Sequence, residues 1–167
     1  MGFLMEYTLT DSEQLIARFV AKQRSGNNRN AGTVNMRKSE MSDFEIDLQG
    51  FGGELAFCRL ANVFPDLTVH NRSASKGEDQ GDCILNGQRI DVKTSKKAEA
   101  ALWVPVRKIG TADAYALMTG KFPTFRLVGM ADVETVKNEK VWNDSHVVNQ
   151  DKLIDIAVWQ FDLWAKG

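Results

Sequence analysis

The order of hydrophobic and polar residues predicts a helix close to the start of the chain. Thr10-Asp11-Ser12-Glu13 matches a capping box, in which the side chains of Thr10 and Glu13 satisfy free backbone amides at a helix start. Hydrophobic residues then recur at helical spacing, at Leu15, Ile16, Phe19 and Val20. The basic residues of this helix or its end are expected to line a solvated face, namely Arg18, Lys22 and Arg24. Residues 25–33 are polar and predict a flexible loop.

Three further segments have helical character. Gln49-Gly50-Phe51-Gly52-Gly53 breaks the pattern and precedes a predicted helix that ends near Asn62. Asp132 is positioned to cap a short helix through Lys137. The segment from Leu153 to Trp164 is amphipathic, which predicts a closing helix.

Asn86-Gly87 lies between two alternating runs and predicts a tight β-hairpin, because a type I′ turn needs positive φ at both central residues. In that register Leu85 pairs with Gln88, and the ladder runs back to a pair formed by Asp82 and Asp91. Strand alternation then directs one set of side chains to the core, namely Cys83, Leu85, Ile90 and Val92.

Four other segments have the composition of strands, and they cover residues 67–69, 102–106, 115–119 and 125–130. A proline in the second predicts an edge strand. The continuous apolar runs of the last two predict a sheet covered on both faces. Residues 71–80 are polar and predict a mobile loop, and residues 141–142 and 146–148 fit no single state.

The second face of the predicted hairpin carries Asp82, Asp91 and Lys93. Carboxylates directly across a strand pair have Cβ atoms about 5 Å apart and repel each other. A chain that only had to fold would rarely keep both, so we expect a cation between them. Mg²⁺ takes carboxylate oxygens together with phosphate oxygens and water. Lys93 projects from the same face, where it is positioned to hold a water molecule or to neutralise a phosphate.

Glu54 is a carboxylate on an otherwise apolar helix stripe that includes Phe57 and Cys58. Burying a carboxylate is costly unless it is paired or bound to a metal. Glu54 is therefore either a metal ligand or a first-turn residue stabilised by the helix dipole. The glycines before it would let a backbone or a phosphate approach closely.

A helical Glu, an Asp, an Asn-Gly turn and the triplet Asp91-Val92-Lys93 follow one another here. In this order they resemble the active-site motif of the PD-(D/E)xK nuclease superfamily, over about residues 50 to 130. Gly81 stands where the family name has Pro, and Asp91 where Glu is more frequent. The resemblance implies an α/β fold: a restriction-endonuclease-like core with a central mixed β-sheet flanked by helices.

The resemblance also implies the roles of the site residues. The catalytic residues would be Glu54, Asp82, Asp91 and Lys93. The ligands of a Mg²⁺ ion, which Mn²⁺ could replace, would be Glu54, Asp82, Asp91 and the Val92 carbonyl. The adjoining residues Thr94, Ser95, Lys96 and Lys97 would contact the substrate, with the lysines on phosphates. Lys96 and Lys97 could equally be ordinary surface lysines.

Length and composition limit the remaining choices. A chain of 167 residues fits one domain, with residues 1–48 as an N-terminal extension of helix and polar loop and residues 49–167 as the catalytic core. The net charge of −1 gives no overall basic field, so DNA binding would need a local patch. Cys58 and Cys83 fall in apolar patterns, which indicates buried thiols in a reducing compartment. The chain shows neither a signal peptide nor an apolar run of about 20 residues, which predicts a cytoplasmic protein without membrane contact.

Together these observations predict a Mg²⁺-dependent nuclease, an endonuclease acting on DNA through a metal-activated water. The alternative is a module of the same fold that has lost activity and binds nucleic acid or serves as a scaffold. A metal-dependent enzyme acting on nucleotides would be a third class, but the chain has no P-loop glycine pattern. A homodimer is one way to supply the two sites that cutting both strands requires. The sequence distinguishes neither DNA from RNA nor endonuclease from exonuclease action.

Overall fold

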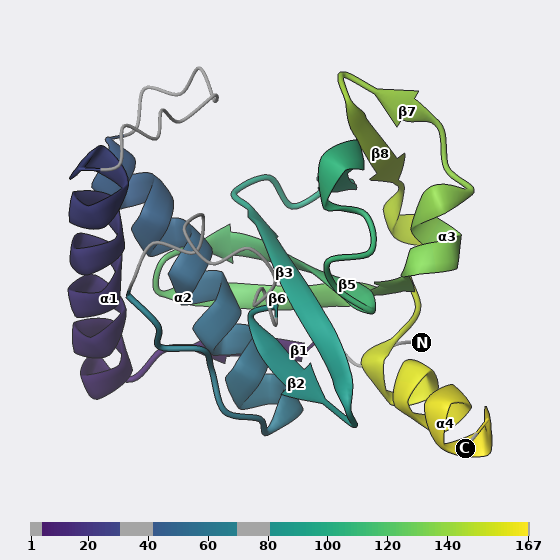
Figure 1. Ribbon diagram of the computed structural model, residues 1–167. Helices are drawn as coiled ribbons and strands as arrows, with labels where there is room; N and C mark the ends of the chain where they lie inside the picture. Colours follow the sequence, from purple (N-terminus) through teal and green to yellow (C-terminus); the bar gives the residue numbers. More distant parts are fainter. Residues whose placement is uncertain (1–4, 31–41, 70–80, 167) are drawn as a thin grey trace.

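A computed structural model describes residues 5–30, 42–69 and 81–166 of the chain (Figure 1). Its main sheet has five strands in the order β1-β6-β5-β3-β2. These strands are β1 (Met5–Thr8), β2 (Cys83–Leu85), β3 (Gln88–Ser95), β5 (Ala114–Lys121) and β6 (Thr124–Asp132). β3 and β5 run parallel and the other neighbours antiparallel, so the sheet is mixed. The predicted α/β class with a mixed sheet and helices is thus confirmed.

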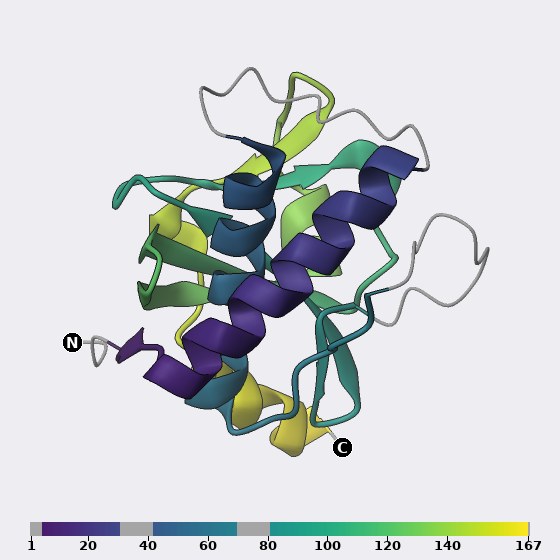
Figure 2. The ribbon, with the colours of Figure 1, turned by 90° about the vertical axis from the view of Figure 1, so that its left-hand side faces the viewer.

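Helices α1 (Asp11–Asn30) and α2 (Asp43–Ala61) cover one face of this sheet. α2 lies against the strands and α1 lies outside it, crossing it diagonally in the side view (Figure 2). The closing helix α4 (Ile156–Lys166) packs against β6, which confirms a helix in this region although it begins three residues later than predicted. No helix within the described ranges combines the length and the apolarity needed to cross a bilayer.

A second, three-stranded sheet has the order β4-β8-β7. It consists of β4 (Leu102–Pro105), β7 (Val141–Trp142) and β8 (Ser145–Val148). β4 is an edge strand, as its proline predicted. Helix α3 (Val133–Lys137) joins the two sheets, and the Asp132 carboxylate accepts a 2.7 Å hydrogen bond from the Thr135 amide, which confirms the predicted cap.

The capping box of α1 is confirmed, because the Thr10 amide donates to Glu13 Oε2 and the Glu13 amide donates to Thr10 Oγ1. Of the four hydrophobic residues that predicted this helix, only Val20 is buried. The helix contacts α2 through Val20 and two small residues, Ala17 and Ala21. The loop predicted from residue 25 is wrong as far as Asn30, because α1 continues to that residue, and residues 31–33 lie outside the described ranges.

α2 begins at Asp43, well before the predicted start at the glycines, and it crosses the expected boundary between residues 48 and 49. A capping box determines this start: the Glu45 amide donates to Ser42 Oγ, and the Ser42 amide donates to Glu45 Oε2. The glycines therefore lie inside the helix. Its end is as predicted, with Asn62 in the left-handed conformation at φ 54°.

The hairpin has the predicted register near its turn, with Leu85 opposite Gln88 and Cys83 opposite Ile90. Asn86 and Gly87 have φ values of 50° and 76°, as a type I′ turn requires. The strand predicted at residues 67–69 is wrong. These residues are irregular, and the Arg24 side chain donates hydrogen bonds to the carbonyl of Thr68 and to that of Asp66, just before the segment. The predicted mobile loop at residues 71–80 lies outside the described residues.

β5 is buried on both faces, as its continuous apolar sequence predicted. Ala114, Ala116 and Met118 belong to the core beneath α1 and α2. Tyr115 and Leu117 belong to a second core shared with the three-stranded sheet and α3. This strand therefore joins the two hydrophobic cores, and its neighbour β3 carries the candidate site.

Candidate active site

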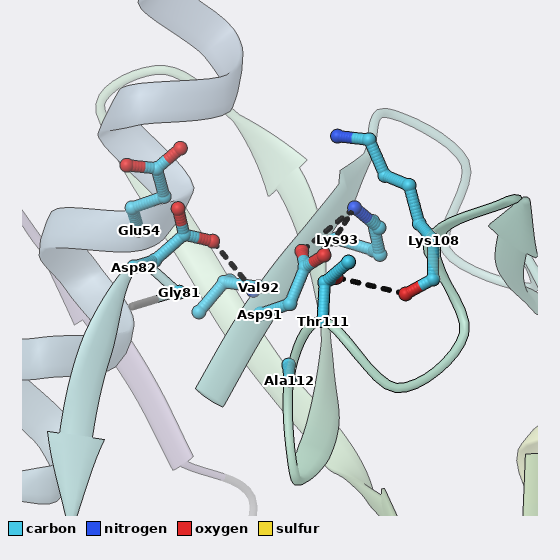
Figure 3. A pocket seen from close by; sticks show the side chains of 9 residues that line it. All are labelled: Glu54, Gly81, Asp82, Asp91, Val92, Lys93, Lys108, Thr111 and Ala112. Atoms are coloured by element: carbon cyan, nitrogen blue, oxygen red, sulfur yellow. Dashed lines mark hydrogen bonds and ion pairs between the residues drawn. The ribbon is translucent and has the colours of Figure 1, made fainter. Parts of the chain in front are cut away.

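A pocket of about 150 Å³ lies at the edge of β3, beside the point where β2 begins (Figure 3). It is lined by residues from α2, from the start of the hairpin, from β3 and from the connection between β4 and β5. These residues are Glu54, Gly81, Asp82, Asp91, Val92, Lys93, Lys108, Thr111 and Ala112. All the catalytic and metal-binding residues predicted from the sequence are among them. We call this site the carboxylate pocket.

Asp82 departs from the predicted ladder. Its amide donates a 2.7 Å hydrogen bond to the Ile90 carbonyl, the residue that already pairs with Cys83, so Asp82 does not lie opposite Asp91. The buried Asp82 carboxylate instead accepts a 2.7 Å hydrogen bond from the Val92 amide. The predicted repulsion between two directly opposed carboxylates is therefore wrong, because the Asp82 side chain is turned toward the backbone edge of β3.

Gly81 makes this departure possible. Its φ is +73°, and a Cβ placed on it would lie 2.6 Å from the Ile90 carbonyl oxygen. Any larger residue would clash with β3 and would be strained at this φ. Glycine is thus a physical requirement at the position where the family name has proline.

Asp91 and Lys93 project from the same face of β3, as predicted, and form an ion pair. Lys93 Nζ lies 2.7 Å from Asp91 Oδ1 and 2.9 Å from Oδ2. The Val92 amide points to the edge of β3 at which Asp82 lies. Because the amide and carbonyl of one strand residue point to the same side, the Val92 carbonyl is also directed to that edge. This orientation is the one expected of a ligand in the pocket.

Close packing of α2 on β3 brings Glu54 to the pocket. A Cβ on Gly53 would lie 2.0 Å from Thr94 Oγ1, so the helix backbone and the strand approach as closely as glycine permits. The glycines were expected to let a backbone or a phosphate approach, but at Gly53 the close neighbour is the side chain of Thr94. Glu54 is the next residue of the helix and is carried to the same edge as Asp82 and Val92.

Arg24 is a functional candidate that the sequence interpretation placed on a solvated face. Its side chain is only 16% exposed, and its Nη1 forms a 3.2 Å ion pair with Glu54 Oε2. The same guanidinium donates to the carbonyls of Asp66 and Thr68 and lies over the ring of Phe51. Arg24 therefore positions Glu54 against the segment that leads toward Asp82. Only the packing of α1 on α2 reveals this role.

Asp47 lies on α2, seven residues before Glu54. Burial raises the pKa of Asp47, and the nearby charge of Asp43 adds to the rise. Arg24 offsets part of it by favouring the ionised carboxylate. The guanidinium thus stabilises acidic groups at two positions of α2, and Glu54 is the one that lines the pocket.

The two cysteines are buried and free, as the sequence predicted. A hydrogen bond with the Cys83 side chain raises the pKa of the Cys58 thiol, and burial and the charges of Glu54 and Asp82 raise it further. The Cys58 thiol therefore stays protonated at neutral pH, close to those carboxylates.

The residues predicted to contact substrate are distributed differently. Thr94 Oγ1 is buried against Gly53, and among the described residues it is a buried side-chain oxygen with no hydrogen-bond partner. Ser95 Oγ accepts a hydrogen bond from the Lys97 amide within a turn. Lys96 and Lys97 are exposed and do not line the pocket. Their contact with substrate stays a prediction.

Lys108 and Thr111 line the pocket and were missed from the sequence. They lie on the connection between β4 and β5, in Arg107-Lys108-Ile109-Gly110-Thr111, which has no periodicity or motif that points to function. Their position depends on the parallel pairing of β3 with β5, because that pairing brings the start of β5 beside Asp91.

The donors of the pocket fit Mg²⁺ in their chemistry, since three carboxylates and a strand carbonyl supply the hard oxygen ligands that this ion takes. Two of the carboxylates, Glu54 and Asp91, are ion-paired with Arg24 and Lys93. Among the residues the structure describes, no three histidine, cysteine, aspartate or glutamate side chains are grouped closely enough to hold a metal ion.

Comparisons with curated proteins and with solved structures gave no match. One family model does match, over residues 2–122, a range that includes β1, both long helices and every residue of the carboxylate pocket. The family is described as one of unknown function, and the chain belongs to this family, DUF5843.

Proposed function

We propose that this protein is a metal-dependent nuclease that hydrolyses phosphodiester bonds, with DNA as its substrate. One observation carries the proposal: a single pocket collects Glu54 from a helix and Asp82, Asp91 and Lys93 from a hairpin. These residues supply the hard oxygen ligands and the cation that metal-assisted hydrolysis of a phosphodiester uses. The mixed sheet with α2 packed on it also supports a restriction-endonuclease-like core.

The proposed ligands are Glu54, Asp82, Asp91 and the Val92 carbonyl. A Mg²⁺ or Mn²⁺ ion held there would supply a Lewis acid for the phosphate and a water molecule of lowered pKa. Asp82 is held in place by the Val92 amide, and Glu54 by the guanidinium of Arg24. These contacts fix two carboxylates before a substrate arrives, which reduces the reorganisation that binding requires.

Lys93 is the proposed catalytic cation. Its ammonium is held at the pocket by Asp91, at 2.7 Å. From this position it would orient the attacking water and stabilise the negative charge that develops on the phosphate. Asp91 would then serve both as a metal ligand and as the group that positions Lys93.

A second candidate is a module of the same fold that binds nucleic acid without cutting it. The ion pairs of Glu54 with Arg24 and of Asp91 with Lys93 favour it, because each carboxylate is already neutralised by a side chain. The DNA substrate, the cytoplasmic location and the homodimer stay predictions in either case.

The deciding experiment is a cleavage assay on linear, circular and branched DNA and on RNA, with Mg²⁺, with Mn²⁺ or with chelator. Lys93→Ala should reduce the rate by about a hundred-fold or more, because a preorganised charge at the transition state is removed. Lys152→Ala is a matched control, since Lys152 is also ion-paired, with Glu139, but lies outside the pocket. It should cleave at the wild-type rate.

Cleavage that requires metal and Lys93 would support the nuclease. Binding of nucleic acid without cleavage, under every metal tested, would favour the inactive module. If the protein neither binds nor cleaves nucleic acid, both candidates are contradicted. Circular substrates separate endonuclease from exonuclease action, because they offer no free end.

A further inference from the structure

The carboxylate pocket has two chemically different sides. Glu54 and Asp82 lie on one side of Val92, while Lys93 and Lys108 lie on the other (Figure 3). Asp91 lies between the two groups. The acidic side suits a metal ion, whereas the basic side suits an anion.

Lys108 projects from a firmly held turn, a short 3₁₀ helix at Val106–Lys108. Its carbonyl accepts hydrogen bonds from the Thr111 hydroxyl at 2.8 Å, the Thr111 amide at 3.2 Å and the Tyr115 hydroxyl at 3.1 Å. Tyr115 is fully buried in the second core, so this turn is fastened to the interior. The backbone of Lys108 is therefore fixed, unlike that of a lysine on a loose surface loop.

The two ammonium groups of the pocket differ in how they are used. Lys93 Nζ contacts both oxygens of Asp91, and these contacts neutralise it. Lys108 Nζ forms neither a hydrogen bond nor an ion pair with any of the residues described in the structure. Its side chain is only half-buried and extends toward the same region as Lys93. The Lys108 ammonium is thus a positive charge that is not paired with a carboxylate of the pocket.

We propose that Lys108 is a substrate-positioning residue that binds a phosphate group of the strand entering the carboxylate pocket. This inference rests on the proposed function and extends it. A phosphate is the anion that fits, because its oxygens bind hard cations and ammonium groups alike. Phosphate contacts fix the register of a nucleic acid on its protein without reading its sequence. Lys108 would hold the backbone so that the scissile phosphate lies beside Lys93.

The test compares the wild type with Lys108→Met, Lys108→Arg and a control, Lys121→Met. Lys121 is exposed and lies on the β5–β6 hairpin, at the opposite end of β5 from the pocket-lining residues Thr111 and Ala112. Fluorescence anisotropy would measure the affinity of a labelled DNA duplex across a series of salt concentrations. Ca²⁺ would replace Mg²⁺, since both take oxygen ligands. A second arm would measure competition by inorganic phosphate, and thermal unfolding would check that each variant is folded.

Lys108→Met should weaken DNA binding by about ten-fold or more, because a charge-assisted hydrogen bond is lost. The slope of log affinity against log salt should fall by about 0.9, the value for one phosphate contact on B-DNA. Lys108→Arg should keep the wild-type slope, and so should Lys121→Met. Wild-type affinity and slope in folded Lys108→Met would overturn the inference, even if the nuclease itself is active.

If the wild type binds inorganic phosphate but no DNA, and Lys108→Met loses the phosphate, the anion site stands while the nuclease proposal fails. If neither ligand binds the wild type, both proposals fail.

Discussion

Asp82 shows how one side chain can serve both folding and chemistry. It is 6% exposed, and its carboxylate accepts a hydrogen bond from the Val92 amide at 2.7 Å. That amide lies on the edge of β3 beyond the last residue pair of the hairpin, so it has no ladder partner on β2. Asp82 replaces the missing strand contact and at the same time presents an oxygen to the carboxylate pocket.

Two substitutions of Asp82 separate the contribution of its hydrogen bond to stability from the contribution of its charge. Asp82→Ala should lower the free energy of unfolding by about 1–3 kcal/mol, because the buried Val92 amide loses its acceptor. Asp82→Asn keeps an amide oxygen of the same shape and should lose about 1 kcal/mol, the difference between a charged and a neutral acceptor. Urea unfolding in the presence of chelator measures both values.

Asp162→Ala is the control, because Asp162 is exposed on α4 and should change stability little. Equal stability of Asp82→Ala and the wild type would show that this hydrogen bond does not hold the hairpin edge in solution.

At the scale of elements, the contact between α2 and β3 determines where Glu54 lies. Gly53 of the helix and Thr94 of the strand are in van der Waals contact without space for a methyl group. Gly50, in the preceding turn of the same helix, has no atom within 4 Å of its Cβ position. The two glycines therefore provide a matched pair for testing the packing.

Gly53→Ala should destabilise the protein by about 1–3 kcal/mol through overpacking, although alanine is the better helix former. Gly50→Ala should stabilise it by up to about 1 kcal/mol, because only the helix propensity changes. Thr94→Ala should recover part of the loss in the Gly53→Ala background, since the closest atom to the new methyl group is removed. Denaturant titration of the wild type, Gly53→Ala, Thr94→Ala and the double variant measures the coupling between the two positions.

A Gly53→Ala protein as stable as Gly50→Ala would mean that the helix and the strand are further apart than the structure has them. Movement of α2 would also displace Glu54, so Gly53→Ala should lower metal-dependent cleavage more than Gly50→Ala does.

At the scale of the whole molecule, β5 couples the two hydrophobic cores. Leu117 is 1% exposed on the side of the three-stranded sheet, while Met118, the next residue, is buried beneath α2. Because β5 contributes side chains to both cores, unfolding of this strand disrupts both cores together. The described part of the molecule should therefore unfold in one transition.

Leu117→Ala should therefore lower the free energy of unfolding by about 2–5 kcal/mol in a single transition. Tryptophan fluorescence and far-ultraviolet circular dichroism should give the same midpoint. Leu15→Ala is the control, because Leu15 is 71% exposed and should change stability by less than about 0.5 kcal/mol. Two separate transitions in Leu117→Ala would contradict this coupling and would show that the three-stranded sheet melts on its own.

Features that depend on neighbouring residues could be predicted from the sequence. The Asn86-Gly87 turn fixed the hairpin register, because its backbone conformation is accessible to few residue types. The capping box at Thr10 and the apolar run of β5 were also identified, since both depend on a few consecutive side chains. The predicted helix start at the glycines is wrong, because the capping box of Ser42 and Glu45 starts the helix at Asp43. The helical spacing of Leu15 and Phe19 did not predict their exposure. They are exposed because alanines of α1 provide the contact with α2.

The sequence by itself thus determined the turns, the strands around them and the set of carboxylates. It also placed Glu54, Asp82, Asp91 and Lys93 as one candidate site, which the fold brings to one pocket. Only the tertiary structure decided that Arg24 holds Glu54, that Asp82 leaves the ladder, and that Lys108 completes the basic side. The physical reason is that these contacts join residues far apart in the chain. Their positions follow from the packing of α1 on α2 and of β3 beside β5, which no local pattern of residues encodes.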